Sequence, residues 1–546
     1  MSEARTSEKA KAGKGGPRIN RNVELEAIRP ELAEVIERHA FGLDERRPDV
    51  VARRQLKNQR TVRTNVEDLC DPGSFVEYGP LALSAQRQRR SMDDLVRRTP
   101  ADGLITGIGT VNGSLFDENK ARCMVMAYDY SVLAGTQGYF NHKKKDRMLS
   151  LCYEQRLPLV FFGEGGGGRP GDVDADGVMV AGLDLPTFAL FARLSGRVPV
   201  VGIVSGYCFA GNAALLGCCD AIIAAKNSNI GMGGPVMIEG GGLGVFRPEE
   251  VGPIDVQRQN GVVDIVVEDD VEMVAVARKY LSYFQGAVSQ WAAADQRILR
   301  HLIPENRRRV YDVRVVIETL ADTESFLEMR PEFGPGMIAG LLRIEGRPFG
   351  VIANDCRHMA GAIEAEDADK AAHMMQLCEA HGLPLLALLD TPGYMVGPEV
   401  ERRAHVRKAC RMFVVGAHMT VPYFSIVLRR GYGLGAMAMA KGGFHESFFT
   451  ASWPTGEFGG MGLEGAIKAG FKKELEAIAD PQEREDLYNK LVAEAYARGK
   501  AINAAAHLEI DAVIDPADTR KWIMRGLQSV PAERTERAAH AYVDPW

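Results

Sequence analysis

The chain has 546 residues, of which 46% are hydrophobic, 25% charged and 7% aromatic. Since domains cluster near about 100–150 residues, this length predicts at least two large domains. The composition is that of a globular protein and excludes a disordered or fibrous one. A formal net charge of −6 supplies no basic face for DNA or RNA, so we expect no nucleic-acid partner.

Three features of the sequence indicate where in the cell the protein is located. The nine cysteines are scattered without a CxxC pair, which argues against a disulfide framework or a zinc site and favours a reducing cytoplasm. Residues 1–20 lack an apolar core, so we expect a disordered tail and not a signal peptide. The uncharged stretch Val198–Cys219 is long enough to span a membrane. Four glycines and the polar Ser205 and Asn212 interrupt it, so we expect a buried strand, a turn and a helix, and no membrane span.

Helical patterns come first along the chain. The charged stretches Glu24–His39 and Arg46–Arg63 are typical of helices. From residue 103 onwards, apolar runs of strand length alternate with helical stretches, as in Arg122–Tyr128, Lys143–Arg156 and Leu157–Phe162. That alternation predicts an α/β fold.

The same order of elements returns in the second half of the chain. The strand and loop at Leu157–Asp172 correspond to Leu383–Pro398. The strand and turn at Val198–Ala213 correspond to Val421–Ala436, at nearly the same offset. A period of roughly 225 residues exceeds that of solenoid repeats, so it indicates internal duplication of a whole domain.

The boundary between the two copies is expected in the polar region Gln285–Arg309, which follows the helical stretch Val271–Phe284. We therefore predict an N-terminal domain over residues 21–295 and a C-terminal domain over residues 296–546. A long helical tract, Pro481–Ala506, and a short strand within Ile510–Pro516 complete the second copy.

Each copy places a strand before a glycine-bearing turn that leads into a helix. The first amide N–H groups of a helix have no intrahelical partners and lie at the positive end of its dipole, so they stabilise an anion. Two such amides aimed at one oxygen form an oxyanion hole. For one isolated loop, tight turns alone would account for the glycines; matched loops in a duplicated domain favour a function. The candidates are Gly166, Gly167, Gly168, Gly211 and Asn212 in the first copy and Gly393, Tyr394, Leu434 and Gly435 in the second.

Motifs of other enzyme and binding-protein classes are weak or absent in this sequence. Gly431–Gly435 contains a GxGxG string, but it lacks the spacing of the dinucleotide-binding fingerprint. The sequence has no GxxxxGK[ST], HExxH or GxSxG motif, and its eleven histidines show no metal-ligand spacing, so we expect no metal. Lone histidines such as His373 and His445 are more often surface or hydrogen-bonded residues than catalytic ones.

The segment Val198–Ala225 resembles the oxyanion segment of the crotonase superfamily. Further motifs, in order along the chain, resemble the carboxyltransferase (β) subunit of biotin-dependent acyl-CoA carboxylases, the group that contains propionyl- and methylcrotonyl-CoA carboxylases. These motifs are Gly346–Asn354, Asp369–Ala372, Asp390–Tyr394 with Glu401 and Arg407, Trp453–Thr455 and Ile514–Arg520. The resemblance covers nearly the whole chain from about Arg60 onwards and implies two tandem crotonase-like (ClpP/crotonase) domains.

This resemblance implies a transfer of a carboxyl group from carboxybiotin to the α (or vinylogous) carbon of an acyl-CoA, through a thioester enolate. Gly211 and Asn212 would serve the thioester oxygen, and Leu434 and Gly435 the oxygen of biotin. The remaining expected contacts are Gly135, Gly166, Gly167 and Gly168 for the acyl-CoA and Gly393, Tyr394 and Met437 for biotin. The freed biotin would take the α-proton, so Glu164, Asp390 and Glu401 are expected to be loop anchors and not bases.

The resemblance also implies a hexamer, a trimer of dimers, with each site on a face shared by two subunits. The sequence has no Met-Lys-Met biotinylation site and no ATP-grasp region. We therefore expect an α subunit that supplies the biotin carboxylase and the biotin carboxyl carrier.

The sequence departs from the family at both amide pairs. The family commonly has Gly-Gly and Gly-Ala where this chain has Gly211-Asn212 and Leu434-Gly435. Met437 stands where carboxylases of short straight-chain acyl groups often carry Asp, so the acyl group stays open. The alternative functions are a biotin-dependent decarboxylase, a biotin-independent crotonase-type hydratase or hydrolase, and a non-catalytic scaffold subunit.

Overall fold

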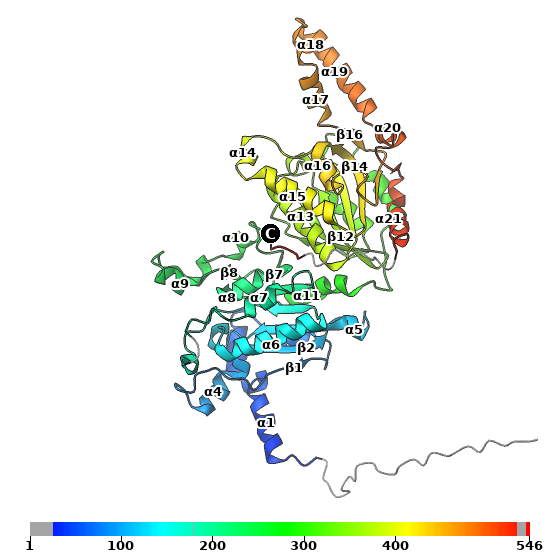
Figure 1. Ribbon diagram of the computed structural model, residues 1–546. Coiled ribbons are helices and arrows are strands. Elements are labelled where there is room, and N and C mark those ends of the chain that lie inside the picture. Colours follow the sequence, from blue (N-terminus) through cyan, green and yellow to red (C-terminus); the bar gives the residue numbers. More distant parts are fainter. Residues whose placement is uncertain (1–25, 178–179, 532–541, 546) are drawn as a thin grey trace, which may run out of the picture.

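Figure 1 shows the computed structural model of the protein, which describes residues 26–177, 180–531 and 542–545. The tail expected at residues 1–20 lies outside this part of the chain. The chain forms two stacked bodies, and each contains one large sheet. The first sheet ends at Val267 and the second begins at Leu327. The domain limits 21–295 and 296–546 stay a prediction.

Within the described residues, the first sheet has seven strands in the order β1-β2-β3-β4-β5-β7-β9. β1, β2 and β3 pair antiparallel, and β3, β4, β5, β7 and β9 pair parallel. A small parallel pair, β6 with β8, lies beside it. The strands are β1 (Val76–Glu77), β2 (Leu104–Thr110), β3 (Arg122–Tyr128), β4 (Leu159–Phe162), β5 (Val200–Val204), β6 (Tyr207–Phe209), β7 (Ala221–Ala225), β8 (Asn229–Gly231) and β9 (Ile265–Val267).

The second sheet repeats this order strand for strand, as β10-β11-β12-β13-β14-β15-β17, with β16 paired to β14. β10, β11 and β12 are again antiparallel and the following strands parallel. The predicted α/β fold and the internal duplication are confirmed. The strands are β10 (Leu327–Met329), β11 (Met337–Ile344), β12 (Arg347–Asn354), β13 (Leu385–Thr391), β14 (Tyr423–Tyr432), β15 (Phe449–Ser452), β16 (Glu457–Gly459) and β17 (Ala512–Val513).

The helices fill the connections between the strands. Those of the first half are α1 (Pro30–Ala40), α2 (Pro48–Gln55), α3 (Val62–Leu69), α4 (Met92–Arg98), α5 (Glu118–Ala121), α6 (Tyr139–Gln155), α7 (Thr187–Ala192), α8 (Gly211–Leu216), α9 (Pro235–Gly240), α10 (Ile254–Gln257) and α11 (Asp270–Gln285). Those of the second half are α12 (Val313–Leu320), α13 (Ala365–His381), α14 (Pro398–Glu401), α15 (His405–His418), α16 (Gly433–Met439), α17 (Leu463–Gly470), α18 (Lys472–Glu476), α19 (Pro481–Arg498), α20 (Ala501–Ala506) and α21 (Thr519–Gln528).

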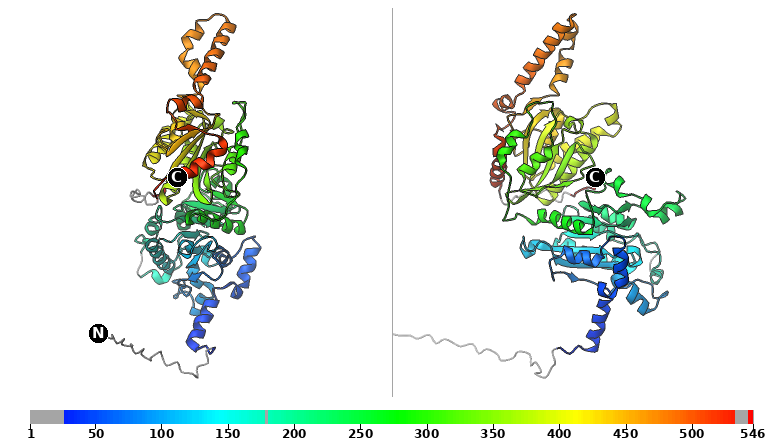
Figure 2. Two further views of the ribbon diagram at one scale, coloured as in Figure 1. Left: turned by 90° about the vertical axis from the view of Figure 1, so that its right-hand side faces the viewer. Right: turned by 180° about the vertical axis from the view of Figure 1, so that it is seen from behind.

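The stretch Arg46–Arg63 is not continuous helix, which corrects the sequence expectation. Asn58 takes a positive φ of 53°. Thr61 then accepts a hydrogen bond from the Thr64 N–H (3.2 Å) as the N-cap of α3. The tract Pro481–Ala506 likewise divides at Gly499 into α19 and α20. The helices α17 to α19 project from the second body as an arm, clear of the rest in every view (Figures 1 and 2).

One apolar core joins the two bodies. It contains Val125 and Ile203 from the first sheet, Ile352 and Leu389 from the second, and Tyr280 of α11 between them. Separate cores cover the outer faces, one in each half. The two sheets are therefore held in a fixed relation by buried apolar area, which dominates the energetics of domain packing.

The C-terminal residues add hydrogen bonds and an ion pair across this junction. The Ser195 hydroxyl donates to the Val543 carbonyl (2.8 Å) and accepts from the Val543 N–H (3.0 Å). Asp544 forms an ion pair with Arg411 of α15, and its carbonyl lies 3.1 Å from Nδ1 of His373 in α13. The last described residues thus connect the first half to two helices of the second.

The stretch Val198–Cys219 forms β5, β6 and α8, as predicted. Among the described residues, we find no helix that is both long and apolar enough to cross a membrane.

Candidate functional site

The starts of α8 and α16 are equivalent points in the two halves. β6 ends at Phe209 opposite Gly231 of β8, and β14 ends at Tyr432 opposite Gly459 of β16. The next residues are Ala210 with φ of 52° and Gly433 with φ of 58°. The following pairs also correspond, so Gly211 matches Leu434 and Asn212 matches Gly435 at one common offset.

These helix starts present free amide donors. In the part of the chain that the structure describes, the N–H groups of Gly211, Asn212, Leu434 and Gly435 have no hydrogen-bond partner. Adjacent unpartnered donors in the first turn of a helix are suited to an oxygen that carries negative charge. Leu434 is 63% exposed, so the second pair is open to a ligand.

The glycine loop of the first half is held by its own hydrogen bonds. The Gly166 N–H donates to the Ala134 carbonyl (3.0 Å), and the Gly167 N–H donates to Oδ1 of Asn212 (3.2 Å). These two amides are therefore engaged within the protein. At Gly168, the position of a Cβ is open, with no atom within 4 Å. The role of Gly166, Gly167 and Gly168 in acyl-CoA binding stays a prediction.

Gly135 belongs to a turn that occurs in both halves of the chain. The sequence candidates included its residue only in the first half. Leu133, Ala134 and Gly135 have φ of 49°, 54° and 60°, and Met359, Ala360 and Gly361 have φ of 43°, 54° and 82°. A Cβ on Gly135 would collide with the Glu164 carbonyl, and one on Gly361 with the Asp390 carbonyl. The Ala-Gly pair recurs at the offset of the duplicated strands, and this is the sequence signal that could have identified Gly361.

Gly393 and Tyr394 pack directly against the start of α16. A Cβ on Gly435 would lie 2.7 Å from the Gly393 carbonyl carbon and 2.8 Å from the Tyr394 nitrogen. The Tyr394 hydroxyl donates to the Ala409 carbonyl of α15 (3.0 Å), so the phenol anchors the loop from within. Met437, on the same helix, is 39% exposed. Biotin contacts at Gly393, Tyr394 and Met437 stay predictions.

Two buried carboxylates lie at equivalent points of the two halves, Glu164 just after β4 and Asp390 near the end of β13. Glu164 pairs with Arg54 (2.8 Å), and Asp390 pairs with Arg429 (2.8 Å) and Arg430 (2.7 Å). Burial raises the pKa of Glu164 to about 7 against the charge of Arg54. Burial also disfavours ionised Asp390, but Arg430 and Arg429 outweigh it and lower the pKa. Glu164 thus joins the loop after β4 to α2, and Asp390 joins β13 to β14; their expected role as anchors and not bases stays a prediction.

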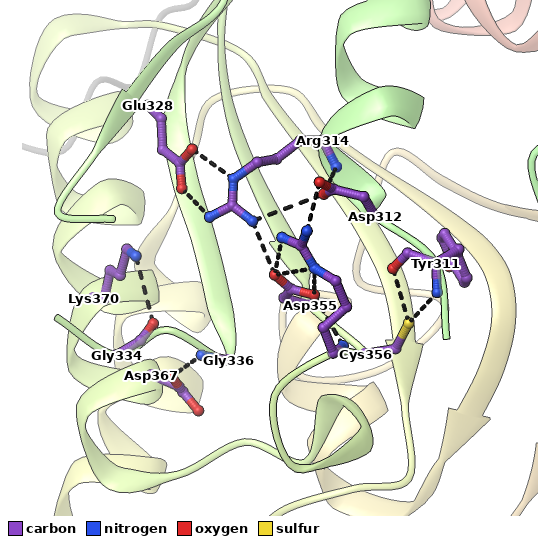
Figure 3. A network of polar contacts seen from close by, with 11 residues as sticks. Tyr311, Asp312, Arg314, Glu328, Gly334, Gly336, Asp355, Cys356, Asp367 and Lys370 are labelled. Atoms are coloured by element: carbon purple, nitrogen blue, oxygen red, sulfur yellow. Dashed lines mark hydrogen bonds and ion pairs between the residues drawn. The ribbon is translucent and has the colours of Figure 1, made fainter. Parts of the chain in front are cut away.

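A second set of charged residues supports the strand ends and was absent from the sequence candidates. Figure 3 shows Arg314 of α12 between Glu328 (2.8 Å) and Asp355 (2.9 Å), which directly follows β12. In the first half these contacts are divided between two arginines, because Asp129, directly after β3, pairs with Arg47 (2.6 Å) and Glu77 of β1 pairs with Arg63 (3.0 Å). Nearby, Asp367 of α13 accepts from the Gly336 N–H (2.9 Å; Figure 3).

The two amide pairs do not meet within one chain. α8 belongs to the first body and α16 to the second, and α13 and α15 lie between them in Figure 1. The two pairs therefore lie in different bodies of the chain.

Comparison with known proteins identifies the family. The profile of the family named Carboxyl transferase domain matches residues 53–541. The chain belongs to the carboxyl transferase domain family. This confirms the family recognised from the motifs, together with its carboxyltransferase activity and two-domain crotonase-like fold.

Named relatives span most of the chain. The methylmalonyl-CoA carboxyltransferase 12S subunit of Propionibacterium freudenreichii subsp. shermanii is 29% identical over 93% of this chain and 95% of its own length. The biotin-dependent acetyl-/propionyl-coenzyme A carboxylase β6 subunit of Mycobacterium tuberculosis (strain ATCC 25618 / H37Rv) is 30% identical over 81% of this chain and 92% of its own.

Solved structures of similar proteins match most of this chain. A single-chain, multi-domain long-chain acyl-CoA carboxylase has a TM-score of 0.87 and 56% identity, covering 91% of this chain. The match covers 49% of that carboxylase, so this chain spans about half its length. The hexameric transcarboxylase 12S, solved with methylmalonyl-CoA bound, has a TM-score of 0.80 and 27% identity over 95% of this chain and 98% of its own.

Proposed function

We propose that this chain transfers a carboxyl group between carboxybiotin and the α-carbon of a long-chain acyl-CoA. The observation that carries the reaction is the pair of matched helix starts, each with two free amide donors, in a chain of the carboxyl transferase family. The 56% identity to a long-chain acyl-CoA carboxylase, against 27–30% for the methylmalonyl-, acetyl- and propionyl-CoA relatives, supports the long-chain substrate.

The first pair serves the acyl-CoA. Removal of the α-proton places negative charge on the thioester oxygen, and the N–H groups of Gly211 and Asn212 stabilise that charge. Amides fixed before the reaction contribute more than water does, because they need no reorganisation. Ala210 fixes their direction, since its φ of 52° turns the chain from β6 into α8.

The second pair serves biotin. Carboxybiotin supplies the carboxyl group and, once freed of it, a nitrogen that accepts the α-proton. The donor set at Leu434 and Gly435 fits the carbonyl oxygen of biotin, because two adjacent N–H groups lack partners in the described part of the chain and Leu434 is exposed. Leu434 and Met437 also expose apolar side chains on this helix.

One complete site requires two chains. Because α8 and α16 are separated within one chain, the first half of one subunit faces the second half of its neighbour. The hexameric transcarboxylase 12S supports a hexamer for this chain. A biotin carboxylase and a biotin carboxyl carrier supply carboxybiotin. We place the reaction in the cytoplasm, since all nine cysteines lie in the described part of the chain and are free thiols.

The test is the half-reaction run from the carboxylated product. Purified protein is incubated with biocytin and with either carboxylated palmitoyl-CoA or methylmalonyl-CoA, and carboxybiocytin is measured by mass spectrometry. We expect kcat/KM to favour the long-chain ester by at least about tenfold, since each buried methylene adds to binding. Transfer without that preference contradicts the long-chain substrate class. If neither ester supports transfer, the proposed reaction is contradicted.

A further inference from the structure

The side chain of Asn212 lies at the meeting point of three segments. It is fully buried, with 0% exposure. Its Oδ1 accepts from the Gly167 N–H (3.2 Å) and from Nε2 of Gln137 (3.2 Å), and its Nδ2 donates to the Gly135 carbonyl (3.3 Å). One carboxamide therefore joins the turn at Gly135, the loop at Gly167 and the start of α8.

The surrounding chain is shaped to admit this carboxamide. A Cβ on Gly165 would collide with Nδ2 of Asn212, and a Cβ on Gly211 would lie 3.1 Å from Nε2 of Gln137. Since only glycine lacks that atom, the space taken by the Asn212 carboxamide depends on glycine at position 165, whereas at Gly211 the contact with the Gln137 side chain would be only tight.

The second half reaches the same arrangement without a carboxamide. Gly435 takes the place of Asn212 and Ile363 the place of Gln137, at the offsets of the duplicated elements around them. There the Gly393-Tyr394 peptide packs directly onto Gly435. The Ile363 N–H donates to the Gly393 carbonyl (3.0 Å), as the Gln137 N–H donates to the Gly167 carbonyl (2.7 Å). The Asn212 carboxamide thus fills a gap that the second half closes with backbone.

We propose that the Asn212 side chain is the positioning residue of the acyl-CoA half-site. It locks the Gly135 turn and the Gly167 loop to the helix whose N–H groups face the thioester oxygen. This inference rests on the proposed function for its effect on catalysis, but not for its effect on the loops. Fixing donors before the reaction is a main source of oxyanion stabilisation, and small misplacements lower the rate.

The variant Asn212→Ala keeps the backbone N–H and removes the carboxamide. The matched control is Asn141→Ala in α6, because Asn141 is also 0% exposed, accepts from the Tyr128 hydroxyl (3.2 Å) and donates to the Asp102 carbonyl (3.2 Å). Both variants lose a buried carboxamide with its partners, so both should lower the melting temperature. Asn212→Gly, which introduces the residue found at the equivalent position 435, provides a second variant.

The first readout is hydrogen–deuterium exchange of the segments 131–138 and 163–170 in the intact oligomer. Asn212→Ala should accelerate exchange there by about tenfold or more, because the Gly167 N–H loses its acceptor, whereas Asn141→Ala should not. The second is the biocytin half-reaction, in which Asn212→Ala should lower kcat/KM by about 10–100-fold with most of the loss in kcat, and Asn141→Ala should stay within about twofold.

Each result is decisive. Unchanged exchange in both segments, or kinetics of Asn212→Ala equal to those of Asn141→Ala, would overturn the positioning role. If the unmodified protein transfers no carboxyl group, the proposed function fails. Hydrogen–deuterium exchange still tests whether Asn212 holds the two loops in place. Full activity of Asn212→Gly with slow loop exchange would likewise contradict the inference.

Discussion

Ala210 and Gly433 both take a positive φ at equivalent positions in the two halves of the chain, 52° and 58°. Each directly precedes a pair of free amides at the start of a helix. The second half uses glycine, which adopts a positive φ freely, but the first half uses alanine, which does not. Strain retained at such a position is characteristic of functional sites.

This relationship predicts opposite effects of reciprocal substitutions. Ala210→Gly should raise the free energy of unfolding by about 1 kcal/mol, because the strain of the Cβ is removed. Gly433→Ala should lower it by about 1–3 kcal/mol, because a Cβ adds the same strain and would lie 2.9 Å from the Gly460 carbonyl oxygen. Urea denaturation measures both. Equal signs for the two substitutions would refute the shared constraint.

Gly435→Ala should disable the proposed biotin site. The new Cβ would lie 2.7–2.8 Å from the Gly393 and Tyr394 backbone, so the loop must move. We expect transfer to biocytin to fall about 100-fold, in line with the cost of a displaced oxyanion donor. Gly462→Ala is the control, because its Cβ would meet no atom within 4 Å. Similar activity of the two variants would exclude a close fit at Gly435.

The two buried carboxylates predict opposite dependence of stability on pH. The pKa of Glu164 is raised from an ordinary 4.5 to about 7, so the folded state holds this proton more tightly than the unfolded state does. The stability that Glu164 contributes is present below pH 4.5 and is lost as the pH rises to about 7. The advantage of the native protein over Glu164→Gln should therefore shrink between about pH 5 and about pH 7.5.

Asp390→Asn provides the contrast. The pKa of Asp390 lies below its ordinary 3.8, so its contribution is present above that value and is lost as the pH falls. Unfolding free energies measured across this range check both signs. A Glu164→Gln difference that grows with pH would show that Arg54 outweighs burial.

The C-terminal residues are predicted to stabilise the junction of the two halves. Ser195→Ala removes two hydrogen bonds to Val543, which is 7% exposed. We expect a loss of about 1–3 kcal/mol in the free energy of unfolding. Ser529→Ala is the control, because its exposed hydroxyl donates only within its own turn (2.7 Å). A loss no larger than that of the control would show that the contact does not contribute.

The repeat, the strands and the helix starts could be predicted from the sequence because they depend on local pattern. Val198–Cys219 and Val271–Phe284 have the elements that their apolar spacing indicates. The break at Asn58 was missed, since a single residue with positive φ leaves no periodic signal. The engagement of Gly167 by Asn212 and of Ser195 by Val543 depends on long-range packing that no local pattern encodes.

The separation of the two amide pairs was also beyond the sequence, although the resemblance implied a shared face. From this separation we derive the central claim, that the first half of one subunit and the second half of its neighbour form one site. Gly211→Pro and Leu434→Pro each remove one N–H donor at matched positions, and proline is tolerated in the first turn of a helix. Each oligomer alone should lose about 100–1000-fold in carboxyl transfer.

The most direct measurement is the transfer activity of mixed oligomers made by reassembling these two variants together. Random assembly should place about a quarter of the sites between two unmodified halves, so the mixture should recover about a quarter of the native activity. Separately assembled variants, combined after assembly, should show no recovery. If reassembled mixtures stay as inactive as the separate variants while differently tagged subunits co-purify, the shared site is contradicted.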